Sequence, residues 1–140
     1  MPQIYRSMIE DEGKPLIANR ADGLGVRCGN GPHDDIPVTG SGEVAPGSGG
    51  MSVAPNWRCL PSHRIPRRLR TKHSSATGND RFACWTMGLG HFVSSSLRPE
   101  LDMRVESKNH GLVEPHSKTQ LETYVSNLIA TRDEWIVDEN

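Results

Sequence analysis

The sequence predicts a small α+β domain: a split antiparallel β-sheet with long loops and a C-terminal amphipathic helix. The chain has 140 residues, which suits a single domain spanning residues 1–140. Its 14 glycines and 10 prolines indicate many turns, and a hydrophobic content of only 34% indicates a thin core. Apolar residues alternate in several short segments, and they follow a helical spacing only near the C-terminus.

The first half predicts strands followed by a long loop. Residues 3–9 (QIYRSMI) are rich in β-forming residues and predict the first strand. Residues 15–20 fit a short strand or a helical turn, and residues 23–28 (GLGVRC) fit a second short strand. Residues 30–50 combine glycine, proline, serine and aspartate at a density that no helix sustains, so they predict a long ordered loop. A pair of short extended pieces within it, around residues 36–38 and 44–45, stays open.

The second half carries further strand patterns. Residues 50–54 are extended and apolar, and residues 82–87 (FACWTM) have a strong strand composition. Residues 97–105 alternate apolar and polar side chains, which predicts one half-buried strand. Residues 109–115 (NHGLVEP) form another strand-like segment that ends at a proline. Pro66 interrupts the chain and leaves residues 67–71 (RRLRT) as a predicted short strand or turn.

A helix is predicted from about Lys118 to Trp135. Its apolar residues recur every three or four positions and define a single stripe, with polar residues outside it. A stripe of this kind needs a sheet to cover it. The stripe consists of Leu121, Tyr124, Val125, Leu128, Ile129 and Trp135.

Charge is unevenly distributed, although the formal net charge is only −1. Residues 45–79 contain no acidic side chain but hold the basic run at residues 64–72, and residues 133–139 are acidic. This asymmetry predicts either an anion site or an internal charge match. Nucleic-acid binding is disfavoured, because few aromatic residues accompany the basic run and prolines prevent a reader helix.

Cysteine and histidine spacing argues against disulfides and metals. The three cysteines include no CxxC pair, and the six histidines include no HxxxH or HExxH spacing. No metal site is therefore predicted. The N-terminal residues have no apolar signal core, and no stretch approaches the length that spans a bilayer. We expect a cytoplasmic protein without a membrane partner, and delivery into a target cell by a route without a cleaved signal peptide stays open.

Two segments carry candidate binding residues. Arg6, at the end of the first predicted strand, can present a planar fork of donors to a phosphate, or it can be a surface arginine of an edge strand. Gly49 and Gly50 allow close approach of the backbone to a ligand, which the hydroxyl of Ser52 can then contact. The alternative interpretation is a loop that enters a strand.

A third segment offers an acid–base pair. His110 and Glu114 are four residues apart on a predicted strand, so they share one face of it. A histidine and a carboxylate placed in this way can orient a substrate and stabilise a developing cation. The alternative is a turn-capping histidine and a solvated glutamate.

Several motifs, in this order, resemble those of the small type VI secretion effector toxins whose fold is similar to ADP-ribosyltransferases. Residues 4–8 (IYRSM) resemble the family's opening Leu-Tyr-Arg strand, and residues 49–53 (GGMSV) resemble its Gly-Gly-Thr-Ser-Val string. Residues 60–69 (LPSHRIPRRL) resemble its Ile-Pro segment, and residues 110–115 (HGLVEP) resemble its histidine-containing strand before the last helix. The sequence departs from the family at Met51, which replaces a threonine, and at Glu114, a carboxylate beyond the family's pattern.

This resemblance implies a cytotoxic, NAD-dependent ADP-ribosyltransferase or NAD glycohydrolase that uses NAD as a substrate, acts on an intracellular target and has a neutralising immunity-type partner. Arg6 would bind a phosphate or ribose, Ser52 would contact the nicotinamide ribose, and Tyr5 or Trp57 would stack on an aromatic ring. The implied cofactor-binding residues are Arg6, Tyr5, Gly50, Met51, Ser52 and Trp57, and the implied catalytic residues are His110 and Glu114.

The implied reaction is chemically coherent. Breaking the bond between nicotinamide and ribose builds positive charge on the sugar, which a carboxylate bonded to the ribose 2′-hydroxyl stabilises. Two alternatives stay open. One is a non-catalytic binding module of the same fold, favoured by the lost hydroxyl at Met51. The other is a phosphate- or nucleic-acid-binding protein that uses residues 64–72.

Overall fold

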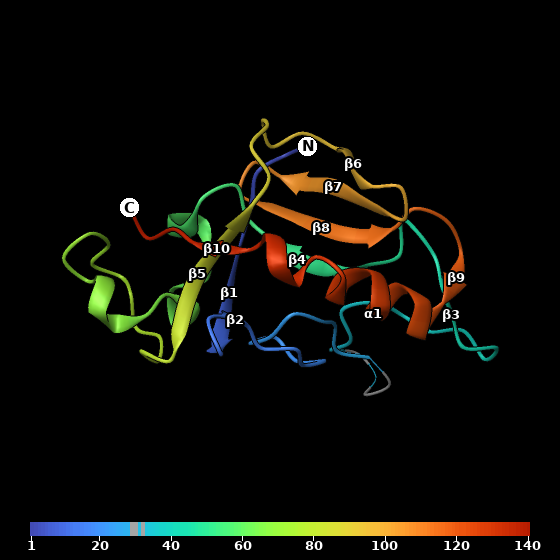
Figure 1. The fold of residues 1–140 in the computed structure, drawn as a ribbon, viewed down its shortest axis with the longest axis horizontal. Coiled ribbons are helices and arrows are strands. Elements are labelled where there is room, and N and C mark those ends of the chain that lie inside the picture. The colour runs from blue at the N-terminus through green and yellow to red at the C-terminus, as the bar shows by residue number, and fades with distance from the viewer. Residues whose placement is uncertain (29–30, 32) are drawn as a thin grey trace.

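The computed structural model describes residues 1–28, 31 and 33–140. This part of the chain folds into two four-stranded sheets, a two-stranded sheet, several 3₁₀ turns and one α-helix (Figure 1). All strand pairings between the named strands are antiparallel. The predicted α+β class with an antiparallel sheet and a C-terminal helix is therefore confirmed.

The first sheet has the order β10-β5-β1-β2. Its central pair is β1 (Ile4–Asp11) and β5 (Phe82–Met87), which confirms the strands predicted at residues 3–9 and 82–87. The flanking strands are β2 (Lys14–Pro15) and β10 (Ile136–Val137). Residues 4–8 of β1 are buried on both faces, and the two polar side chains among them, Arg6 and Ser7, are hydrogen-bonded to main-chain carbonyls.

The second sheet has the order β4-β8-β7-β6. The predicted strands at residues 50–54 and 109–115 appear as β4 (Met51–Val53) and β8 (His110–Pro115). The single strand predicted at residues 97–105 is wrong. This region is the hairpin of β6 (Ser95–Arg98) and β7 (Leu101–Ser107), because Pro99 and Glu100 form a tight turn between them, as proline favours.

The two large sheets meet at one point and then part. Tyr5 N donates to Ala54 O at 2.8 Å, and Ala54 N donates to Tyr5 O at 2.9 Å. No further β1–β4 pairing occurs in the described residues. Arg6 on β1 and Ser52 on β4 therefore lie where the sheets diverge.

The α-helix α1 (Leu121–Ile129) is shorter than predicted at both ends. It begins late because β9 (Thr119–Gln120) pairs with β3 (Glu43–Val44). It ends early because Thr131 Oγ1 donates to Leu128 O at 2.6 Å, and a 3₁₀ turn, η4 (Arg132–Glu134), follows. Trp135 is buried in the core, as the apolar stripe predicts, but it lies outside the helix.

The loops also differ from the prediction. The predicted strand at residues 23–28 is wrong, because these residues form only an isolated bridge between Leu24 and Ile17. Of the long loop at residues 30–50, residues 30 and 32 lie outside the described part, and β3 is the strand found in the rest. No helix in the described residues has the length and apolar character needed to cross a membrane.

Three 3₁₀ turns cover the second face of the first sheet. They are η1 (Trp57–Cys59), η2 (Ser62–Arg64) and η3 (Arg67–Leu69). Their apolar side chains pack with Tyr5 and Cys84 in a second hydrophobic cluster, separate from the main core under α1. The basic segment at residues 64–72 is thus a series of turns, one of the two predicted conformations.

Candidate functional site

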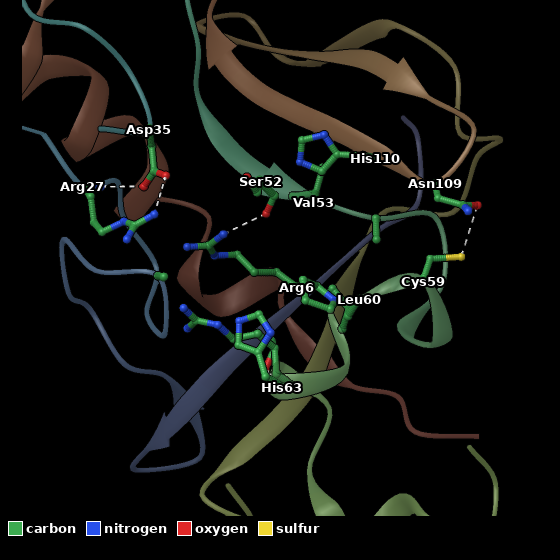
Figure 2. A pocket seen from close by; sticks show the side chains of 15 residues that line it. Arg6, Arg27, Asp35, Ser52, Val53, Cys59, Leu60, His63, Asn109 and His110 are labelled. Carbon is green, nitrogen blue, oxygen red and sulfur yellow. Dashed lines mark hydrogen bonds and ion pairs between the residues drawn. The ribbon is translucent and has the colours of Figure 1, made fainter. Parts of the chain in front are cut away.

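A pocket of about 380 Å³ opens where β1 and β4 part (Figure 2). Its volume falls within the range of small-molecule sites, roughly 300–1,000 Å³. Its walls come from β1, β4, the turns around η1 and η2, the side chains of Arg27 and Asp35, and the β7–β8 turn. It brings together Arg6, Ser52 and His110 from the predicted site (Figure 2).

Arg6 is the most buried charged group of this pocket. Its Nε and Nη2 donate to Gly23 O at 3.1 and 3.0 Å, and its Nη1 donates to Ser52 O at 2.8 Å. Burial lowers the pKa of Arg6 to about 10, so the guanidinium remains charged at neutral pH. None of the ion pairs formed by the described residues involves Arg6, so its buried charge can attract an anion into the pocket.

The loop that holds Arg6 depends on glycine. A Cβ on Gly23 would lie 2.8 Å from Ala18 Cβ, and a Cβ on Gly25 would lie 2.5 Å from Ala18 O. Only glycine therefore lets this loop fold closely enough to turn the Gly23 carbonyl toward Arg6. The segment was predicted as a strand, but its role is to hold the arginine.

Ser52 presents its side chain to the pocket and its main chain to Arg6. Its side chain is exposed, whereas the flanking Met51 and Val53 are buried, as the alternation of a strand requires. Its carbonyl oxygen accepts the Arg6 bond, so the hydroxyl is not used in that contact. Ser52 pairs with Leu112 of β8, which places it level with the midpoint between His110 and Glu114.

His110 lines the pocket on the same side as Ser52 (Figure 2). Figure 2 shows its ring on the β4 side of Arg6, with His63 on the other side. His110 Nδ1 lies 2.8 Å from Glu106 Oε1, which holds the ring in place. An imidazole oriented by a carboxylate can act as a general base or hydrogen-bond donor toward a ligand.

Glu114 shares the face of β8 with His110 but does not line the pocket. It is buried, and its Oε2 accepts hydrogen bonds from Gly47 N at 2.8 Å and from Arg104 Nε at 3.1 Å. The two proposed catalytic side chains are therefore on one face, as expected, but only His110 reaches the pocket. Glu114 ties the loop before β4 to β7 and β8.

Tyr5 and Trp57, the proposed stacking residues, lie in the second hydrophobic cluster and not in the pocket wall. Tyr5 Oη donates to Asp138 Oδ2 at 2.6 Å, and burial together with this bond raises the pKa of Tyr5 to about 12. The ring of Trp57 is buried beneath the Arg58 guanidinium, whose Cζ is 4.3 Å from the ring centroid. Each aromatic ring is thus already occupied by protein contacts.

Gly50 and Met51 support the wall from behind. A Cβ on Gly50 would lie 2.4 Å from Val113 O, so glycine permits the close approach of β4 to β8. Met51 is buried in the main core, and its N–H donates to Tyr124 Oη at 3.2 Å. Gly50 has no side chain, and the Met51 side chain does not line the pocket, because the alternation of β4 directs Ser52 toward it instead.

The sequence did not single out the pair Arg27 and Asp35, which also line the pocket. Arg27 N donates to Asp35 Oδ2 at 2.7 Å, and the two side chains form an ion pair at 3.6 Å (Figure 2). Asp35 is the acidic residue in the lining, against the arginines Arg6, Arg27 and Arg64. The pocket is therefore positive in a chain of net charge −1. No sequence pattern around Arg27 and Asp35 indicated that these two residues would lie beside Arg6.

Two residues of the basic run, Arg68 and Lys72, contact the acidic C-terminal segment. Arg68 Nη2 lies 2.6 Å from Glu139 Oε2, and Lys72 Nζ donates to Glu139 O at 2.9 Å. The acidic end thus pairs with the basic turns, which is one of the two interpretations of the charge asymmetry. Arg64, in contrast, lines the pocket. No group of three or more potential metal ligands occurs in the part of the chain that the structure describes.

The pocket combines a buried guanidinium, a serine hydroxyl and an oriented imidazole at the divergence of two sheets. Such a set can bind an anionic ligand that also carries hydroxyl groups. No protein-family model and no curated protein matches this chain.

Proposed function

We propose that this protein is an ADP-ribosyltransferase-like protein that binds NAD as a substrate in the Arg6 pocket and cleaves its nicotinamide–ribose bond. The observation that carries the proposal is the meeting of Arg6 and Ser52 at the parting of two antiparallel sheets. The resemblance to ADP-ribosyltransferase-like toxins implies the same two residue types on the same two strands.

The pocket chemistry suits a dinucleotide. NAD carries a pyrophosphate, which the excess of arginine in the pocket favours. The hydroxyl of Ser52 is free of the Arg6 contact and offers a partner for a ribose hydroxyl. This arrangement supports a bound NAD with its phosphates near Arg6 and its nicotinamide ribose near β4.

In the proposed reaction the C1′–N bond breaks, and its electron pair leaves with nicotinamide. A nucleophile on the acceptor then attacks C1′ and loses a proton, and hydrolysis results when water is the nucleophile. His110, held by Glu106, is placed to take that proton. Glu114 and Arg104 lie on the same face of the β7–β8 pair as His110. Once its hydrogen bond with Arg104 is broken, the Glu114 carboxylate would stabilise the sugar cation.

A non-catalytic binding module is the second candidate, and one observation favours it. Glu114 is buried, held by Gly47 and Arg104, and outside the pocket lining. A module of this kind binds NAD or a related anion in the Arg6 pocket without releasing nicotinamide.

The decisive experiment measures NAD binding by calorimetry and nicotinamide release by chromatography on the same protein. Glu114→Gln should abolish release while changing the Kd for NAD by less than about twofold, because the amide keeps an oxygen that can accept from Gly47 N but carries no charge to stabilise the sugar cation. Ser52→Ala should weaken NAD binding, and Ser75→Ala, an exposed serine outside the pocket, is the matched control. Binding without release by the unchanged protein would establish the module, and no binding of NAD would overturn the proposed NAD-cleaving function.

The proposal includes toxicity toward an intracellular target and a neutralising protein partner, with activity in the cytoplasm of a target cell. Expression inside a test cell should arrest growth, and Ser52→Ala should relieve the arrest. Ser52 is the better test residue than Arg6, since only Arg6 has extensive structural hydrogen bonds through its side chain. Equal arrest by the serine variant, at equal protein level, would remove the pocket from the toxic mechanism.

A further inference from the structure

Arg64 lines the Arg6 pocket, but the proposed reaction gives it no task. It is the last residue of η2 and is half-buried. Its carbonyl oxygen accepts a hydrogen bond of 2.6 Å from Ser7 Oγ, and its N–H donates to Pro61 O at 2.8 Å. Ser7 is buried and directly follows Arg6 on β1. The main chain of Arg64 is therefore fixed close to the residue at the base of the pocket.

The guanidinium of Arg64 forms no hydrogen bond and no ion pair within the described residues. Its Cζ lies 5.8 Å from the centroid of the Phe82 ring, and a ring satisfies none of the in-plane N–H groups of an arginine. Arg27 of the same pocket differs, because it is paired with Asp35 at 3.6 Å. Arg64 therefore keeps its planar fork of donors for a ligand.

Arg6, in contrast, uses most of its donors within the fold. Its Nε and Nη2 both donate to Gly23 O, and Nη2 has longer contacts with Arg20 O at 3.4 Å and Gly25 O at 3.5 Å. One of its two Nη1 N–H groups donates to Ser52 O. A single N–H is left for a ligand, so Arg6 supplies the pocket with positive charge but not with a fork of donors.

The two arginines give the pocket two positive charges without a carboxylate partner. Neither takes part in an ion pair of the described residues, whereas Asp35 of the lining is paired with Arg27. Burial is the main cause that lowers the pKa of Arg6, and the like charge of Arg64 lowers it further. An anion that binds to both relieves this repulsion. A diphosphate ester, with one negative charge on each phosphate, matches the two positive charges.

We propose that Arg64 is the diphosphate-binding residue of the pocket, and that Arg6 is a positioning residue which holds β1, β4 and the Gly23 loop in place. The guanidinium fork of Arg64 contacts the phosphate oxygens of the ligand, as planar arginine forks commonly do. That the diphosphate belongs to NAD rests on the proposed function. The diphosphate site itself requires neither NAD nor cleavage of its nicotinamide–ribose bond.

The test is calorimetric titration of inorganic pyrophosphate and of NAD into the unaltered protein and two glutamine variants. Arg64→Gln removes the charge and the fork, but it keeps the hydrogen bond from Ser7, which uses the Arg64 main chain. Arg67→Gln is the matched control, because Arg67 is exposed, lies outside the pocket and has no ion pair within the described residues. Circular dichroism establishes that each variant is folded before titration.

Arg64→Gln should weaken the binding of both ligands about 10- to 100-fold, as the loss of charge-assisted hydrogen bonds does. Arg67→Gln should change the affinity by less than about twofold. Arg64→Lys keeps the charge without the fork and should weaken binding about threefold to tenfold, so it tests the proposal if Arg64→Gln does not fold.

Unchanged affinity of Arg64→Gln for a ligand that the unaltered protein binds would overturn the proposal, even if the variant still cleaves NAD. An equal loss in Arg67→Gln would also overturn it, because the effect would then be one of overall charge. An unaltered protein that binds neither pyrophosphate nor NAD has no diphosphate site. Pyrophosphate binding that depends on Arg64, in a protein that does not cleave NAD, would support the diphosphate site while the proposed function fails.

Discussion

Arg6 Nη1 donates a hydrogen bond of 2.8 Å to the main-chain oxygen of Ser52, across the line where the two large sheets part. The same guanidinium binds the Gly23 carbonyl of the loop after β2. One side chain thus ties β1, β4 and a glycine loop together at the base of the pocket. Arg6 therefore both positions the candidate site and stabilises the fold.

Arg6→Lys should lower the free energy of unfolding by about 2–3 kcal/mol, because an ammonium cannot reproduce the fork and buried carbonyls lose their donors. Urea denaturation followed by circular dichroism measures this. Ser52→Ala should change the same quantity by less than about 0.5 kcal/mol, since the Arg6 bond uses the serine main chain. A comparable loss in both variants would contradict the assignment of the bond to the backbone.

Gly50→Ala should destabilise the protein by about 2–4 kcal/mol, because its new Cβ would lie 2.4 Å from Val113 O and force β4 away from β8. Gly40→Ala is a matched control, since no atom lies within 4 Å of a Cβ built there. Thermal unfolding of both variants checks the difference. Equal melting temperatures would show that β4 accommodates a side chain at residue 50.

Tyr124→Phe should lower the free energy of unfolding by about 1–3 kcal/mol, because it leaves a buried N–H and C=O without their partner. Tyr124 Oη accepts from Met51 N at 3.2 Å and donates to Val113 O at 2.5 Å, so it joins α1 to both β4 and β8. Urea denaturation measures the change. The helix supports the pocket through this hydroxyl, and a neutral effect would limit its role to apolar packing.

Cys84 should resist alkylation in the folded protein. Burial first, and then the charge of Glu139, raises the pKa of its thiol from 9.0 to about 12. Iodoacetamide at about pH 8 should therefore modify Cys84 only after unfolding, because the thiolate is the reactive form. Mass spectrometry of the labelled peptides, with and without urea, checks this, and rapid labelling of Cys84 in buffer would refute its burial.

The same shift determines the sign of a pH effect. Because the folded pKa is raised, the folded state keeps a proton that the unfolded state releases. The stability from Cys84 is complete below pH 9.0 and is lost as pH rises toward about 12. Cys84→Ala should reduce the slope of stability against pH in this window, and an unchanged slope would assign the alkaline loss to other groups such as Tyr5.

The spacing of apolar residues along the chain predicted those strands and that part of the helix whose buried face follows a regular period. Residues 82–87 formed β5 as predicted, and the stripe at Tyr124 and Leu128 formed the buried face of α1. The errors have particular physical causes. The turn at Pro99 that joins β6 and β7 was missed, because the alternation of Leu101 and Met103 suggested one continuous strand. The helix α1 begins later than predicted, because β9 pairs with β3, which is distant in sequence.

By itself the sequence determined the α+β class and most of the strands, because side-chain periodicity is a local property. Only the tertiary structure decided which candidate residues meet. Arg6, Ser52 and His110 line one pocket. Glu114 and Trp57 lie outside it, where Glu114 is hydrogen-bonded to Gly47 and Arg104 and Trp57 is buried in the second hydrophobic cluster. These residues come together because the two sheets diverge at β1 and β4 and because loops distant in sequence pack beside them. Their spacing along the chain follows no helical or strand periodicity, so the sequence pattern could not predict the contacts.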